Sequence, residues 1–162
     1  MEKFNPSLMM KTVLLALLAS IIFPVGLIAQ TGEAAEVKAV IEQLFDGMRA
    51  KNTGMIAASF STDAIMQTIA PNETGFQVNN GAVADFIKRI GGTPAETNLD
   101  ERISNYEIKV DGPMATAWTP YEFYVNGNFS HCGVNSFQLV KLAEGWKIVY
   151  IIDTRRKDSC AK

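Results

Sequence analysis

His131 is the residue in this sequence best suited to acid–base chemistry. It is the only histidine, and it lies in the segment Phe-Ser-His-Cys-Gly at 129–133. An imidazole titrates near neutral pH, so a histidine that faces a cavity can act as a general acid or base. Side chains alternate along a strand, which places His131 on one face with Gly133, Asn135 and Phe137. The alternative is a structural role, in which His131 is hydrogen-bonded to the backbone or to a nearby carboxylate.

A second group of candidates ends the last predicted strand, in the segment Asp-Thr-Arg-Arg-Lys at 153–157. An arginine at a cavity mouth, Arg155 or Arg156, can bind a carboxylate or phosphate through paired N–H groups. Asp153 could then serve His131 as a carboxylate partner. The alternative is a solvated strand end, where an ion pair contributes little to stability.

The register of the last hairpin decides which of these side chains share a face. A tight turn at the preceding Glu-Gly pair places Asn135 opposite Thr154, with Arg156 on the same face. One further residue in the loop brings Asp153 and Arg155 to that face instead. The sequence leaves both registers open.

Composition argues against several other chemistries. Fifteen basic and 17 acidic residues give a formal charge of −2, too little positive charge for a surface that follows a phosphate backbone, so we expect no nucleic-acid partner. One histidine and two cysteines, without convergent carboxylates, do not predict a metal site. The sequence contains no phosphate-binding loop, and we expect no cofactor.

The first thirty residues have the pattern of a secretory signal. Residues 12–29 are uncharged and follow directly on Lys11, as in a basic region followed by an apolar one. Cleavage after Ala29 would make 1–29 the signal peptide and 30–162 the mature domain. We therefore expect an exported protein, periplasmic or secreted.

A retained membrane anchor is the alternative for this segment, because 18 apolar residues approach the length that spans a bilayer. Pro24 and Gly26 weaken a continuous helix near its end, and no basic stop-transfer run follows. We therefore expect no stable membrane anchor after cleavage.

Cys132 and Cys160 are the only cysteines. In an oxidising compartment, two cysteines near the ends of adjacent strands favour a disulfide, although the tail must fold back to form it. A Cys132–His131 catalytic pair is disfavoured, because neighbouring residues on a strand point to opposite faces.

The elements that must position these residues form an α+β domain. Apolar residues recur at three- and four-residue steps along 33–51, which predicts an amphipathic helix. A short helix near 53–60, a strand at 64–69 and a third helix starting at Asn79 or Asn80 follow. Turn residues then separate β-prone segments, which predicts a mostly antiparallel sheet. Those segments are 102–111, 114–126, 129–142 and 146–156.

Three stretches resemble the nuclear transport factor 2-like superfamily. They are EQLFDGMRAKNTGMIAASFSTDAIM at 42–66, YEFYVNGNFSHCGVNSFQLVK at 121–141 and GWKIVYIIDTRRKDSC at 145–160. The last two are similar to an exported bacterial subgroup named putative lumazine-binding, or SnoaL-like. The resemblance implies three helices packed on a strongly curved sheet, forming a cone with an internal cavity.

The resemblance also bears on catalysis. In the ketosteroid-isomerase branch of the superfamily, a tyrosine and two acidic residues act on the substrate; here the matching positions are Leu44, Thr68, and Asn135 or Phe137. None of the three groups is retained, so isomerase activity of that kind is not expected.

The same comparison suggests a ligand site and a partner. Trp118, Glu122 and Tyr124 would face outward, where members of the superfamily commonly form homodimers. The residues expected to line the cavity and contact a ligand are Met66, Tyr121, Phe123, Asn135, Phe137, Arg155 and Arg156.

We therefore expect an exported, dimeric protein that binds a small, partly apolar molecule and performs no established catalysis. One alternative is a dehydratase-, cyclase- or isomerase-type enzyme that uses His131 with Asp153 or Tyr121. Another is a dimeric assembly module whose cavity is filled by its own side chains.

Overall fold

Helices and strands are described here for residues 25–160 of the computed structural model, and side chains from residue 32 onward. Contacts divide the chain into two units, Met1–Thr31 and Gly32–Lys162, and the second contains every strand. Most of the predicted signal peptide, 1–29, lies outside the described residues. None of the described helices is long and apolar enough to cross a lipid bilayer.

Among residues 25–160, three helices occur in the predicted order. They are α2 (Val25–Ala50), α3 (Thr53–Ser59) and α4 (Val83–Gly91). The Asn52 side chain begins α3 by accepting a hydrogen bond from the Met55 backbone N–H at 3.1 Å, which satisfies one of the free donors of a helix start. The third helix begins after Ala82, later than predicted, because the residues before it form a strand.

The strands form one seven-stranded sheet with the order β2-β1-β7-β6-β5-β3, and β4 also pairs with β5. Every neighbouring pair is antiparallel except β1 and β7, which run parallel. The mostly antiparallel α+β fold is therefore confirmed. The strands are β1 (Phe60–Asn72), β2 (Gly75–Gly81), β3 (Leu99–Ile103), β4 (Glu107–Asp111), β5 (Met114–Val125), β6 (Asn128–Leu142) and β7 (Gly145–Thr154).

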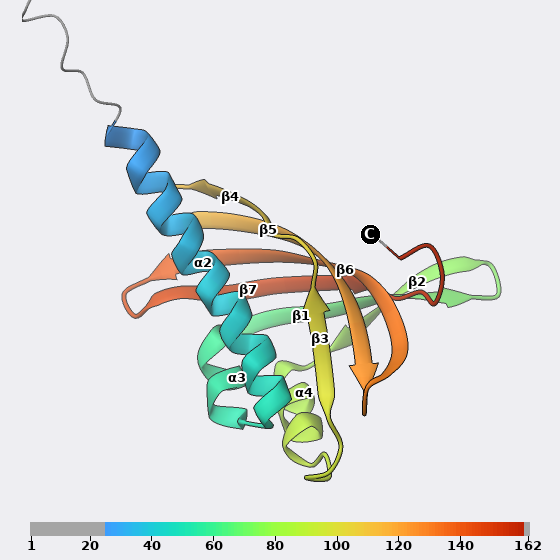
Figure 1. The fold of residues 1–162 in the computed structure, drawn as a ribbon. Coiled ribbons are helices and arrows are strands. Elements are labelled where there is room, and N and C mark those ends of the chain that lie inside the picture. Colours follow the sequence, from blue (N-terminus) through green and yellow to red (C-terminus); the bar gives the residue numbers. More distant parts are fainter. Residues whose placement is uncertain (1–24, 161–162) are drawn as a thin grey trace, which may run out of the picture. The chain divides into compact units, whose positions relative to one another are not determined.

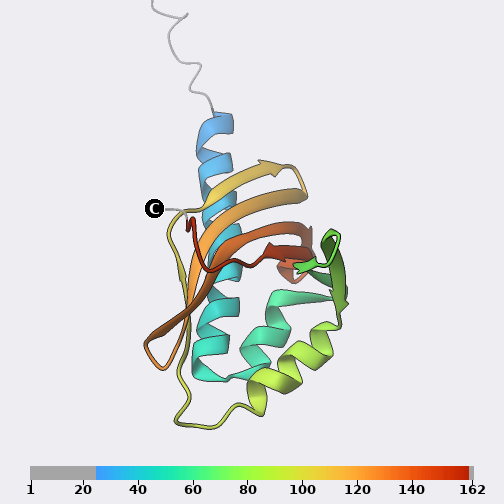
Figure 2. The same ribbon diagram turned by 90° about the vertical axis from the view of Figure 1, so that its right-hand side faces the viewer.

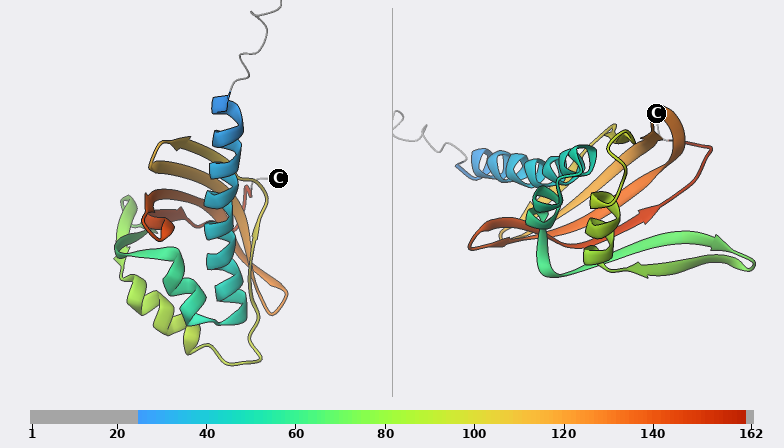
Figure 3. Two further views of the ribbon diagram at one scale, coloured as in Figure 1. Left: turned by 90° about the vertical axis from the view of Figure 1, so that its left-hand side faces the viewer. Right: turned by 90° about the horizontal axis from the view of Figure 1, so that it is seen from below.

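The sequence predicted β1 but not its hairpin partner β2, and the predicted segment 102–111 is divided between β3 and β4. The two strands of the β1–β2 hairpin run out as a long arm, seen from below in Figure 3. Every residue of β2 is exposed, so this strand lacks the alternation of buried and exposed residues by which a strand is recognised.

The helices pack on the concave side of the sheet within the Gly32–Lys162 unit. Figure 1 labels the elements, and Figure 2 shows the strands curving around the helices. The Phe45 ring of α2 meets Phe137 of β6 edge to face, with ring centroids 6.3 Å apart. Phe137 is fully buried, and burying one such side chain contributes about 2 kcal/mol. This contact anchors α2 to the middle of the sheet.

A bulge in β7 sets the register that the sequence left open. The turn is tight, since Leu142 pairs directly with Gly145, but the pairing shifts by one residue between Gln138 and Leu139 of β6. Val149 of β7 is the additional residue. Asn135 is consequently opposite Asp153. The inward side chains are those of the second predicted alternative, and a bulge rather than a longer loop produces them.

Candidate functional site

A cavity of about 630 Å³ lies between the helices and the concave face of the sheet. One part of its wall is apolar and comes from the helices, with Leu44, Met48, Phe86 and Ile90 among the lining residues. The sheet supplies most of the polar lining. That volume lies within the range of sites that hold small molecules.

The strand register arranges the floor of the cavity in rows. One apolar row crosses five strands in direct register, and the next row on the same face is polar throughout. The apolar row is Ala117, Phe137, Ile151, Met66 and Gly81, and the polar row is Thr119, Asn135, Asp153, Thr68 and Asn79. Ala117, Phe137 and Thr119 are buried in the core, and the other members of the two rows line the cavity. Two residues along each strand separate the rows, so both face the helices. The floor thus changes from apolar to polar in one step.

Asp153 is the centre of the polar row. It is 8% exposed and accepts hydrogen bonds from Thr68 Oγ1 at 2.6 Å and from Arg155 Nε at 2.7 Å. Burial lowers the pKa of Arg155, but the hydrogen bond and charge of Asp153 more than offset this, and the net shift is upward. A buried carboxylate paired in this way is held in one position.

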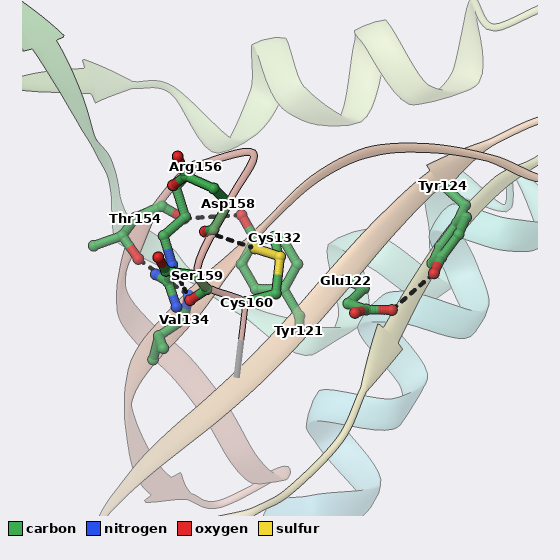
Figure 4. The surroundings of a disulfide bond; sticks show 10 residues. All are labelled: Tyr121, Glu122, Tyr124, Cys132, Val134, Thr154, Arg156, Asp158, Ser159 and Cys160. Carbon is green, nitrogen blue, oxygen red and sulfur yellow. Dashed lines mark hydrogen bonds between the residues drawn. A yellow bond between two sulfur atoms is a disulfide. The ribbon is translucent and has the colours of Figure 1, made fainter. Parts of the chain in front are cut away.

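The Tyr121 hydroxyl also contacts Asp153 and the residue after it in β7. Its hydroxyl lies 3.0 Å from the Thr154 carbonyl and 3.4 Å from Asp153 Oδ2, and Figure 4 shows it reaching Thr154. Burial first, and then the negative charge of Asp153, raise the pKa of Tyr121. The phenol therefore remains protonated at neutral pH and can donate a hydrogen bond.

Glu101 of β3 forms the second polar centre. Its Oε1 accepts a hydrogen bond from Asn135 Nδ2 at 2.7 Å. Burial raises the pKa of Glu101 to about 7; the Asp153 charge adds to the rise, and Asn135 and Arg155 oppose it. This carboxyl therefore exchanges its proton in the physiological range.

His131 borders the cavity, as the sequence predicted. Its Nδ1 lies 3.1 Å from Ser130 Oγ, and its ring packs against Phe123 with centroids 5.1 Å apart. Burial first, and then the charge of Arg155, lower its pKa. Among the described residues, no carboxylate or phenol is hydrogen-bonded to His131, so the geometry does not form a catalytic pair.

The predicted disulfide between Cys132 and Cys160 is present. Figure 4 shows the tail folded back over β6 at this bond. Cys132 and Arg156 exchange two backbone hydrogen bonds, of 2.8 and 2.9 Å. Arg156 donates from Nε to the Ser159 carbonyl within the tail. The disulfide and these hydrogen bonds therefore hold residues 156–160 against β6, directly after Asp153 and Arg155.

Most of the predicted site residues meet at this cavity, and two do not. Phe137 lies on the inward face but is fully buried beneath Phe45, so it belongs to the core. Arg156 lies outside the lining because the bulge turns Arg155 inward and leaves Arg156 with the tail. The predicted residues that line the cavity are Met66, Tyr121, Phe123, His131, Asn135, Asp153 and Arg155.

Sequence reasoning missed several polar members of the site, of which Thr68 and Glu101 make side-chain hydrogen bonds to the predicted residues Asp153 and Asn135. Thr68 stands where the isomerase branch has an aspartate, and its hydroxyl donates a hydrogen bond to Asp153. Glu101 was not considered. Alternation in the segment Leu-Asp-Glu-Arg-Ile at 99–103 places Glu101 on the face of two apolar residues, a signal that could have found it.

The outer face of the sheet also has exposed apolar side chains. Trp118 is 48% exposed and Met114 is 50% exposed on β5. Tyr124 donates to Glu122 on the same face at 2.7 Å. Among the described residues, no cluster of three or more histidine, cysteine or acidic side chains could hold a metal ion.

Comparison with known proteins gives one family and many similar folds. The model of a family described as putative lumazine-binding matches residues 32–151. No curated protein sequence matches the chain. A protein of unknown function from Mycobacterium tuberculosis is 14% identical with a TM-score of 0.66, covering 86% of this chain and 80% of that one.

Two other solved structures are similar. A nuclear transport factor 2-like protein with a cystatin-like fold from Novosphingobium aromaticivorans is 16% identical, with a TM-score of 0.64, covering 86% of this chain and 94% of that one. A putative dehydratase from Streptomyces avermitilis is 14% identical, with a TM-score of 0.61, covering 79% and 99%. At these identities the likeness is one of fold.

Proposed function

The chain belongs to the putative lumazine-binding family of nuclear transport factor 2-like proteins, and from this premise we propose that it binds a small, partly apolar molecule in its cavity. The observation that supports this most directly is the arrangement of the cavity floor, where an apolar row and a polar row lie side by side. A ligand with an apolar body and one polar edge would match both rows at once.

Binding is favoured over catalysis as the function of this site. An enzyme that used His131 would need a carboxylate or phenol within hydrogen-bond reach of the imidazole. His131 instead lies beside Ser130, while Asp153 is engaged by Thr68 and Arg155. An assembly module with a filled interior is disfavoured because the cavity of about 630 Å³ is large enough for a ligand.

We propose that two copies associate through the outer face of β5. The exposed Trp118 and Met114 lie on this face, and aromatic residues and methionine are enriched at protein interfaces. Trp118→Glu should shift the native mass from dimer to monomer. The same substitution at the exposed Phe76 of the β2 arm, Phe76→Glu, should not. A monomeric wild-type protein would contradict the proposal.

We also propose export, with cleavage after Ala29. The Cys132–Cys160 disulfide supports an oxidising compartment. Expression of the full chain in a bacterium, followed by N-terminal sequencing of the periplasmic protein, tests this. A protein retained in the cytoplasm or membrane with residues 1–29 intact would contradict it.

Native mass spectrometry of the protein, purified without refolding, tests the binding function. We expect a bound small molecule that organic extraction removes. Ala70→Trp places a bulky side chain at the cavity lining and should abolish this mass difference, whereas Ala143→Trp in the exposed hairpin turn should not. If wild type and Ala70→Trp retain the same molecule, the ligand lies elsewhere and the proposal is wrong.

A further inference from the structure

We propose that Glu101 recognises the ligand: its protonated carboxyl donates a hydrogen bond to an acceptor oxygen, such as a carbonyl or acidic oxygen, on an otherwise apolar molecule. This inference rests on the proposed binding function and specifies its chemistry. It makes binding depend on one proton, because the ionised carboxylate has no hydrogen to donate and repels an oxygen acceptor.

The position of Glu101 supports this role. It pairs directly with Phe123, which pairs with His131, so these residues form one row across β3, β5 and β6. All three line the cavity. Glu101 Oε1 is occupied by Asn135, and Oε2 makes no hydrogen bond with any described residue. The free oxygen therefore belongs to a side chain whose orientation Asn135 already fixes.

The charges around Glu101 favour its protonated form. Its nearest cations are engaged by other carboxylates, Arg155 by Asp153 and both Arg49 and Arg102 by Asp100. The remaining charged or titratable groups that line the same hollows are His131 of β6, Asp153 of β7, Glu42 and Asp46 of α2, Tyr106, and Arg89 of α4, whose guanidinium lies over the Phe86 ring. Among the described residues, Glu101 thus accepts a hydrogen bond from an amide and lies near the carboxylate of Asp153, but it forms no ion pair with a cation.

A second hollow lets this carboxyl exchange protons without opening the main cavity. It has a volume of about 210 Å³, and Glu101 and Phe45 border both spaces. Its other lining residues are mostly polar and include the exposed Asp46 and Arg49. A proton can therefore reach Glu101 from solvent on one side while a ligand occupies the other.

The expected size of the effect follows from the titration of Glu101 near pH 7. If only the protonated protein binds, the apparent Kd scales with the inverse of the protonated fraction. Between pH 6 and pH 8 that fraction falls about tenfold, so the apparent Kd should rise about tenfold.

A matched pair of fluorescent probes tests the proposal on the full chain. 1-Anilinonaphthalene-8-sulfonate has an apolar body with acceptor oxygens and stays ionised across this range. N-phenyl-1-naphthylamine has the same body without the sulfonate. We expect the sulfonate probe to bind wild type about tenfold more weakly at pH 8 than at pH 6, and the neutral probe to bind equally at both.

Three variants test whether Glu101 causes the pH dependence of sulfonate-probe binding and whether the probes bind in the cavity. Glu101→Gln keeps a donor but cannot titrate, so its affinity for the sulfonate probe should match the wild type at pH 6 and stay there at pH 8. Glu107→Gln, on exposed β4, should behave as wild type. Ala70→Trp should abolish binding of both probes, which places them in the cavity.

The outcomes separate this inference from the binding function. If the neutral probe binds while the sulfonate probe shows no pH dependence, or the same dependence in Glu101→Gln, the role of Glu101 is wrong and the cavity remains a binding site. If neither probe binds, or Ala70→Trp binds both unchanged, both proposals fail.

Discussion

Tyr121 lies directly opposite Gly133 in the pairing of β5 and β6, and its ring passes over the position that a side chain at Gly133 would occupy. A Cβ placed on Gly133 would be 2.9 Å from Tyr121 Cε1 and would overlap the Thr154 carbonyl oxygen. The missing side chain lets the phenol cross β6 to reach β7, where its hydroxyl meets Thr154 and Asp153. The polar centre depends on this one close approach.

Gly133→Ala should therefore displace the end of β7 from Tyr121. We expect the free energy of unfolding to fall by about 2 kcal/mol, the usual cost of overpacking a close-packed site. Denaturant unfolding measures it. Gly32→Ala, where a Cβ meets nothing within 4 Å, is the matched control and should lose no stability. Equal stability of wild type and Gly133→Ala would show that the strands move apart without cost.

Asp153→Ala should destabilise the domain by about 2 kcal/mol, because it leaves the half-buried Thr68 hydroxyl and the Arg155 guanidinium without their acceptor. Thermal unfolding measures the change. Asp63→Ala, on an exposed position of β1, should shift stability by less than about 0.5 kcal/mol. A similar small change in Asp153→Ala would show that water replaces these contacts.

Regular patterns in the sequence predicted most of the fold. The stripe on α2 that contains Leu44 and Phe45 and the turn residues between strands define helices and hairpins locally. The family resemblance supplied the arrangement in space. The strand β2 was missed because an exposed strand carries no such pattern.

The site was less predictable, because it depends on one irregular residue. Alternation placed His131 and Asn135 on one face of their strand, and the family resemblance indicated that this face and Tyr121 lie inside the cavity. Which residue of β7 joins them depends on the bulge at Val149, and nothing in the local sequence marks that position. Arg155 and Arg156 therefore had to remain alternatives.

Reducing the disulfide should weaken the tail and the domain together. Closure of a loop of 28 residues between Cys132 and Cys160 contributes about 3 kcal/mol in the chain-entropy model. Cys160→Ser should lose this amount in denaturant unfolding, and a reducing agent should produce the same loss in wild type but none in the variant. A wild type insensitive to the reducing agent would show that the bond is absent or contributes nothing.

The pH dependence of stability should carry the signature of Glu101. Its pKa is about 7 in the folded protein, raised chiefly by burial from its ordinary value of 4.5. Between these values the unfolded chain releases a proton that the folded chain keeps, so stability falls as pH rises from 4.5 and levels off above 7. The total loss should be on the order of 3 kcal/mol.

Glu101→Gln removes this titration, so the comparison of the two proteins isolates it from His131. The pKa of His131 is lowered, which gives stability the opposite slope below its unfolded pKa. The variant should equal wild type at pH 4.5 and exceed it at pH 8, with unfolding by denaturant measured across the series. The chemical shift of the Glu101 carboxyl carbon should titrate near pH 7. Parallel stability curves for the two proteins, or a carboxyl that titrates near 4.5, would show that Glu101 is ionised in the folded domain.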